Sequence, residues 1–146
     1  MDTGSSTGMP GAVQLNSALL ILRLASAMVF LYHGSAILFG LLGGPGPQGF
    51  ADYLHVPVIV GYLVGLAQFC GGLAMLTGAF VRAGALCIMV VMVGAIFLVH
   101  LPKGFDIGKG GYEYALSEFL LALALLILGG GAYGLAGVLP GALKKC

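Results

Sequence analysis

The chain carries very little charge. Of its 146 residues, 6 are Lys or Arg and 5 are Asp or Glu, so charged residues make up 8%. A soluble domain carries about a quarter charged residues. This chain is instead 60% hydrophobic, with a mean hydropathy of +1.08. A surface that faces water cannot be built from it, so the sequence predicts an integral membrane protein surrounded by the lipid bilayer. A net charge of +1 leaves no basic face and excludes a nucleic-acid partner.

Two further features are missing. The three cysteines, Cys70, Cys87 and Cys146, form no Cys-x-x-Cys pair, which argues against a dithiol mechanism of the thioredoxin kind. We interpret Cys70 and Cys87 as small apolar packing residues. Residues 1–17 contain no Lys or Arg and carry Asp2, whereas a secretory signal begins with a positive segment. The first apolar run is therefore expected to be a retained span.

Long apolar stretches dominate the rest of the chain. Each is near the roughly 20 residues that a helix needs to cross a bilayer. They cover residues 17–39, 56–79, 80–101 and 112–134. The connections between them are short, so the sequence predicts an all-α, integral membrane four-helix bundle with antiparallel up-down spans. We expect a single domain over residues 1–146, with tails at 1–15 and 135–146, and a cap for the first helix at Asn16 or Ser17.

The positive residues indicate an orientation. An even number of spans places both termini on one side, together with Arg23, Arg82, Lys144 and Lys145. The opposite side has Lys103 and Lys109. Because cytoplasmic loops carry the excess of Lys and Arg, both termini are predicted to be cytoplasmic.

Helical spacing predicts which faces pack in the bundle. The second span has one face made of Gly61, Gly65, Gln68, Gly72 and Met75, and the first has a seam made of Arg23, Ser26, Phe30, His33 and Gly40. Small residues allow helices to approach closely in lipid. An amide at Gln68 must find partners inside the bundle, and a helix–helix hydrogen bond is the preferred interpretation. For Arg23, snorkelling to the interface and a buried ion pair are equally favoured.

Glu118 is the strongest functional candidate. It lies about 9 Å below Tyr112 by helical rise, and it shares a face with Tyr114, Ala115 and Ala122. A carboxylate exposed to lipid there would cost about 3 kcal/mol or more, so Glu118 is expected to face the bundle.

His33 and His100 are expected at similar depths on different spans, where two histidines could bind haem or a metal. Hydrogen bonding at the interface is preferred, because haem needs a cleared cavity that the sequence does not indicate. No metal site is predicted. The candidate binding pocket therefore consists of His33, Gln68, His100 and Glu118, and no catalytic residue is assigned.

Several short motifs recur in a characteristic order. The first two spans carry Arg23, Phe30, His33 and Gly34, and then Gly65, Leu66, Gln68, Gly71 and Gly72. The third span and its loop carry Thr77, Gly78, Phe80, Arg82, His100, Gly104 and Phe105, and the fourth begins with Gly110, Gly111, Glu113, Tyr114, Ala115 and Leu116. Over about Leu20 to Gly134 the chain thus resembles the DoxX family of small four-helix bacterial and archaeal membrane proteins.

The resemblance implies a protein of the cytoplasmic (inner) membrane that is linked to redox chemistry. The related DoxD belongs to thiosulfate:quinone oxidoreductase, and other members are associated with oxidative-stress or maturation complexes. Two positions depart from the pattern. Ile37 stands where members commonly have Lys, and Gln68 where many have Glu.

These losses favour a non-catalytic accessory subunit of a larger membrane redox or electron-transport complex. The alternative is an oxidoreductase component that binds quinone in a polar pocket of the outer leaflet. A small transporter or channel is least favoured, because the sequence indicates no broken mid-membrane helix and no repeat. Quinone is compatible with this setting, and haem is disfavoured.

Overall fold

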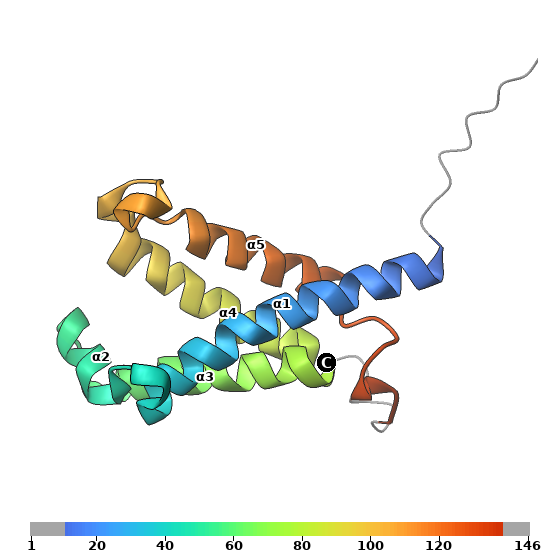
Figure 1. Ribbon diagram of the computed structural model, residues 1–146, viewed down its shortest axis with the longest axis horizontal. Helices are drawn as coiled ribbons and strands as arrows, with labels where there is room; N and C mark the ends of the chain where they lie inside the picture. The colour runs from blue at the N-terminus through green and yellow to red at the C-terminus, as the bar shows by residue number, and fades with distance from the viewer. Residues whose placement is uncertain (1–10, 139–146) are drawn as a thin grey trace, which may run out of the picture.

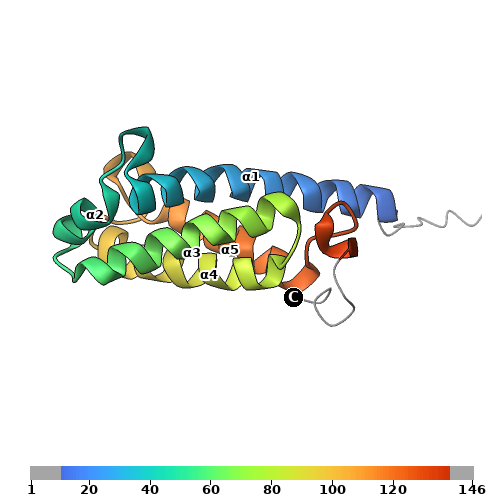
Figure 2. The same cartoon turned by 90° about the horizontal axis from the view of Figure 1, so that it is seen from below.

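The computed structural model describes residues 11–138, and this part of the chain is helical without strands. Four long helices run side by side (Figures 1 and 2): α1 (Ala12–Phe39), α3 (Val58–Thr77), α4 (Val81–Ala95) and α5 (Glu113–Leu128). A short amphipathic helix, α2 (Gly46–Leu54), connects α1 to α3. A π-helical turn, Ile96–His100, extends α4, and short 3-10 turns cover Leu41–Gly43, Leu101–Lys103, Ile107–Lys109 and Leu135–Val138.

The all-α prediction is confirmed, but the helix count differs from it. Within residues 11–138, three segments are long and apolar enough to cross a membrane: α1, α3 and the segment Val81–Lys103, which contains α4. The last long helix, α5, has 16 residues and is about 24 Å long by helical rise. It ends at Gly129, which has φ 77° and leaves the helical conformation. The predicted fourth span, 112–134, is therefore too long, and a fourth crossing stays a prediction.

The predicted cap of the first helix is wrong. The helix α1 begins at Ala12, and the Gly11 N–H donates to Gln14 Oε1 at 2.8 Å. Asn16 instead accepts a hydrogen bond from the N–H of Ala132 at 2.9 Å. A side chain expected to cap its own helix thus joins α1 to the segment that follows α5.

Glycines bring α1 and α3 into close contact. A Cβ on Gly34 would lie 2.5 Å from the backbone nitrogen of Phe69, and one on Gly72 would lie 2.8 Å from that of Leu31. Such contact is expected where small residues allow helix backbones to approach. The predicted packing face of the second span is confirmed, because Gly61, Gly65, Gln68, Gly72 and Met75 are all buried.

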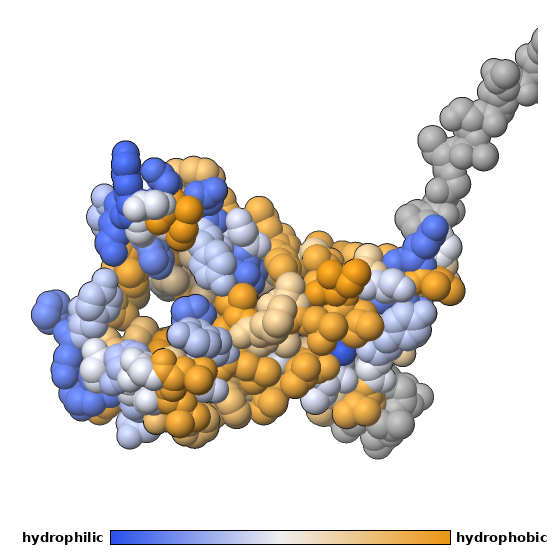
Figure 3. Space-filling view, viewed as in Figure 1, coloured by the Kyte–Doolittle hydropathy of each residue, from blue (hydrophilic) through white to orange (hydrophobic). Residues whose placement is uncertain are grey.

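The two ends of the bundle differ in shape. In Figure 1 the pair α4–α5 lies close to the pair α1–α3 near the start of α1, and the pairs separate toward α2. Figure 3 shows the surface hollowed between them there, with hydrophilic residues bordering the hollow. We call this the open end. The closed end contains the start of α1, the α3–α4 turn and the end of α5.

Candidate functional site

Arg23 lies inside the closed end and is 1% exposed. Its Nε donates to the Met75 carbonyl at 2.9 Å and its Nη2 to that of Leu76 at 3.3 Å. Its Nη1 donates to the carbonyls of Gly130, at 2.9 Å, and Tyr133. Carbonyls at helix C-termini lack intrahelical partners and carry partial negative charge. In the described part of the chain, therefore, neither snorkelling nor an ion pair describes Arg23, which binds backbone carbonyls.

The guanidinium fixes the segment after α5 to the other helices. A Cβ on Gly78 would collide with it, and one on Gly134 would lie 3.1 Å from Nη1. A Cβ on Gly130 would lie 2.7 Å from Val81 Cγ2. The closed end is thus tightly filled, which argues against a continuous pore through the bundle.

Among the described residues, three other buried polar side chains each have an oxygen that forms no hydrogen bond. Ser26, Gln68 and Glu118 are 0%, 6% and 8% exposed. Within residues 11–138, Ser26 Oγ, Gln68 Oε1 and Glu118 Oε2 are buried without a hydrogen-bond partner. Buried polar atoms in proteins nearly always have one, so these oxygens are unusual.

Helix contacts relate the heights of Gln68 and Glu118. Gly71 of α3 packs against Gly84 and Ile88 of α4, and Val81 at the start of α4 packs against Gly130. Counting residues from these contacts along antiparallel helices places Glu118 about one turn nearer the open end than Gln68. The prediction that Glu118 faces the bundle is confirmed by its burial, and Ala115 and Ala122 are buried with it. Tyr114, which is predicted to share this face, is exposed.

Ser26 lies at a different height along the bundle axis from Gln68 and Glu118. It is three residues from Arg23, about one turn along α1, whereas Gln68 lies at the height of the contact between Gly34 and Phe69. Of these three oxygens, those of Gln68, in the middle of α3, and Glu118 therefore lie farther toward the open end than that of Ser26.

His33 is exposed, contrary to the seam predicted for the first span. Ser26, Phe30 and Ile37 lie on the same stripe of α1, and all three are buried. His33 is therefore exposed although its neighbours on both sides along the stripe are covered. Its ring packs edge-to-face on Tyr32, with centroids 5.3 Å apart. Gly40, the last member of the predicted seam, is also exposed and ends α1 with φ 66°.

His100 is half-buried in the π-helical turn, and its Nδ1 lies 2.7 Å from the Gly110 carbonyl oxygen. A carbonyl only accepts, so Nδ1 must carry the proton. Glu113 acts similarly, accepting from the Ile107 N–H at 3.1 Å. Both side chains hold the loop before α5 and form the rim of the open end. No group of three potential metal ligands occurs among the residues that the structure describes.

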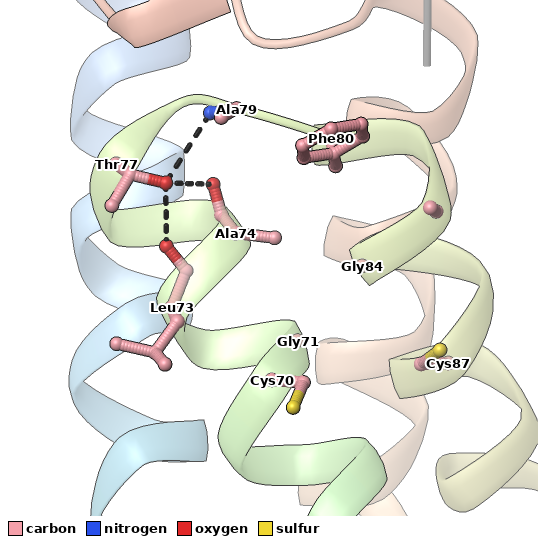
Figure 4. A pocket seen from close by; sticks show the side chains of 10 residues that line it. Cys70, Gly71, Leu73, Ala74, Thr77, Ala79, Phe80, Gly84 and Cys87 are labelled. Carbon is pink, nitrogen blue, oxygen red and sulfur yellow. Dashed lines mark hydrogen bonds between the residues drawn. The ribbon is translucent and has the colours of Figure 1, made fainter. Parts of the chain in front are cut away.

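A second feature is a groove between α3 and α4 on the outer surface, with a volume of about 350 Å³ (Figure 4). Cys70 and Cys87 border it, and both are exposed, so their interpretation as buried packing residues is wrong. Its walls are mostly small residues, and a Cβ on Gly84 would lie 2.7 Å from Ala74 Cβ. Sequence reasoning missed the groove, although the small residues around the hairpin were a signal for it.

The first two spans and the groove helices coincide with a known family model. The model described as DoxX matches residues 18–101, more than half of the chain. This chain belongs to the DoxX family. An uncharacterized protein of Haemophilus influenzae is 32% identical to it over 125 residues, which cover 80% of this chain and 87% of the relative. No solved structure matches the chain.

With its apolar helices, this DoxX chain is a membrane protein. The matched region includes His33, Gln68 and His100 but ends before Glu118. The importance of α5 therefore rests on the burial of Glu118 and on the hydrogen bonds that join the end of α5 to Arg23.

Proposed function

We propose that this DoxX protein is an accessory subunit of a membrane redox or electron-transport complex and that it binds the head group of a quinone-type carrier. One observation carries the proposal. Gln68 and Glu118 are more than nine-tenths buried, and each has an unpartnered oxygen. An amphiphile with a polar ring and an apolar tail would supply the partners that these atoms lack when the helices part to admit it from the apolar interior of the membrane.

The proposal also assigns the protein to a membrane and gives its orientation there. In the bacterial or archaeal cytoplasmic membrane, α5 would make the fourth crossing and the termini would be cytoplasmic. Arg23 and Arg82 lie at the closed end, and the exposed Lys103 and Lys109 lie in the loop at the open end. The remaining positive residues used for this orientation, Lys144 and Lys145, lie outside the described residues. The pocket would then open toward the outer leaflet.

Each pocket residue has a distinct role in the proposal. Glu118 and Gln68 hydrogen-bond the oxygens of the head group. His33, which is exposed, would exchange protons with water. Ile37, at the position where family members commonly have Lys, makes the part of the pocket formed by α1 apolar. Electrons would enter and leave through the partner, which makes this subunit accessory and not a stand-alone oxidoreductase.

The groove between α3 and α4 supports the accessory role. Gly71, Ala74, Ala83 and Gly84 line it, and small residues of this kind allow a further transmembrane helix to approach closely. We propose that a helix of the partner complex occupies it.

Extraction of bound carriers tests the pocket. The protein is purified in mild detergent, and quinones are extracted and quantified by mass spectrometry. We expect near-stoichiometric quinone in the wild type and a clear loss in Gln68→Ala and Glu118→Ala. Glu113→Ala is the matched control, since that carboxylate lies on the same helix but binds the loop. Quinone no higher than in an unrelated membrane protein from the same cells would refute the pocket.

Native purification tests the accessory role. Partner subunits should co-purify in fixed stoichiometry and be lost when Ala83, an exposed residue that lines the groove, is replaced by Leu, whose side chain would fill the groove. Phe97→Leu, at an exposed position elsewhere on the surface, should leave the complex intact. A wild-type protein that purifies alone as a stable monomer contradicts the accessory role.

A further inference from the structure

We propose that Glu118 is a proton-binding site inside the bundle, where it carries a bound proton at neutral pH while the exposed carboxyl groups of the chain are ionised. This goes beyond the proposed function, because it concerns the side chain in the absence of any carrier. The ligand is the proton itself, so the site needs no cavity beside the carboxyl. An accessory subunit of a redox complex would thereby store one proton within the membrane.

Glu118 has no partner that would stabilise a negative charge. The residue is 8% exposed, and its Oε2 is buried without a hydrogen-bond partner. An ionised carboxylate has about four acceptor sites, and a buried one is stable only beside cations or hydrogen-bond donors. A neutral carboxyl carries no net charge. A bound proton therefore removes most of the cost of burying this group.

The side chains around Glu118 on its own helix and on α4 are apolar. Ala115 and Ala122 lie about one turn away on either side along α5, and both are buried. Counting along the antiparallel helices from the contact of α4 with Gly130 places the buried Met92 at about the height of Glu118. These neighbours offer neither a charge nor a side-chain hydrogen-bond donor.

The cations of the helices packed around α5 are held elsewhere. Arg23 of α1 and Arg82 of α4 donate to backbone carbonyls at the closed end. His100 is bound to a loop carbonyl at the rim, and Lys103 and Lys109 are exposed in that loop. The helix α3 contains no charged residue. None of these groups supplies Glu118 with a counter-charge.

Two further titratable side chains lie near the height of Glu118. Counting along α1 from its contact with Gly131 brings His33 to about this height, but His33 is exposed and its ring packs on Tyr32. Tyr114 precedes Glu118 by about one turn on α5 and is exposed. A phenol is neutral at pH 7, so it cannot balance a carboxylate. His33 is accordingly the side chain whose influence the experiment has to test.

The size of the expected effect follows from the behaviour of glutamate in water. There the side chain is protonated in only about one molecule in 500 at pH 7. Full burial without a charged partner favours the neutral form of a carboxyl by up to about 1,000-fold or more. We therefore expect Glu118 to be protonated in most molecules at pH 7.

Infrared spectroscopy tests the proposal, because it detects the proton in place and no reagent has to reach the side chain. The full-length protein is purified in a detergent without carbonyl groups, and the carbonyl stretch of neutral carboxyl groups is recorded at pH 7. We expect a band with the intensity of a single carboxyl, calibrated on the same sample at low pH, where all the acids are protonated. Its frequency should shift in heavy water.

Variants assign the band to a residue. Glu118→Gln keeps the size of the side chain and should abolish the band. Glu113→Gln removes a carboxylate from the same helix that binds the Ile107 N–H instead, and it should leave the band unchanged. His33→Ala should also leave the band unchanged, because the proton on Glu118 does not depend on that imidazole. Circular dichroism and gel filtration establish that each variant is folded.

Two results overturn the proposal. A wild type without the band at pH 7 would show that Glu118 is ionised, and a band that persists in folded Glu118→Gln would assign the proton to another acid. If Glu118→Gln does not fold, Glu118→Asp keeps the acid and should move the band, so an unmoved band also overturns the proposal. Bound quinone is measured separately by extraction, so its absence would refute the carrier pocket and leave this result unaffected.

Discussion

The closed and open ends of this bundle treat buried polar side chains in opposite ways. At the closed end every nitrogen of the Arg23 guanidinium donates to a backbone carbonyl. Farther toward the open end, Gln68 and Glu118 are almost as buried, yet each has an oxygen without a partner. Burial by itself therefore does not identify a functional residue. Unused hydrogen-bonding capacity is what separates a structural polar group from a candidate binding group.

The largest effect is expected from removing Arg23. Arg23→Leu leaves four carbonyls without their donor and frees the segment after α5, so we expect a loss of about 3 kcal/mol or more in stability. Arg23→Lys should also be costly, because an ammonium cannot reproduce the planar fork of donors. Thermal unfolding in detergent measures both. Stability close to that of the wild type would show that the closed end does not depend on this side chain.

Replacement of Glu118 is expected to change stability in the opposite direction. Glu118→Leu removes an unpartnered buried group and replaces it with an apolar one, so we expect unchanged stability or a gain of about 1 kcal/mol in the absence of ligand. The same unfolding experiment applies, with Ala122→Leu as the overpacked control in the fully buried part of α5. A strong loss of stability for Glu118→Leu would mean that this carboxylate has a structural role like that of Arg23.

Accessibility to a water-soluble reagent compares the two ends while Arg23, Gln68 and Glu118 stay unchanged. In a background lacking the native cysteines, His33→Cys should react with a water-soluble maleimide at least about tenfold faster than Ser26→Cys, because the buried thiol needs local opening before it can react. Reaction of the His33 variant in intact cells would also establish that the open end faces outward. Equal rates would contradict a hollow that stops between these two positions of α1.

The smallest effect is expected at the rim. His100→Phe removes the hydrogen bond to the Gly110 carbonyl, and its loss should cost about 1 kcal/mol of stability. The amides of the loop before α5 should then exchange faster with deuterium, while α1 and α3 stay protected. Faster exchange throughout the bundle would show that His100 supports more than the rim.

Local pattern predicted the helix faces well. The buried face of α3, from Gly61 to Met75, follows directly from helical spacing, because the period of a helix fixes which residues share a side. The inward direction of Glu118 followed from the cost of a charge in lipid. The same reasoning failed for His33, which is exposed although Phe30 and Ile37 on the same stripe are buried.

Contacts between distant residues could not be predicted in this way. Arg23 and Gly130 are 107 positions apart, and nothing in the local sequence of α1 indicates a carbonyl partner for a guanidinium. Asn16 has the right residue type for a helix cap, yet it binds Ala132, 116 positions away. Cysteine is a residue type typical of protein interiors, but the crossing of α3 and α4 leaves Cys70 and Cys87 at the surface.

The sequence by itself determined that this is a helical membrane protein, where its long helices lie and which faces carry glycine and polar residues. These properties depend on hydropathy and on the helical period, which are local. Only the tertiary structure decided which end is closed and which polar groups have partners. The reason is geometric: helix crossing angles and hydrogen bonds between remote segments fill one end with Arg23 and its carbonyls, and they leave Gln68 and Glu118 unpartnered toward the other.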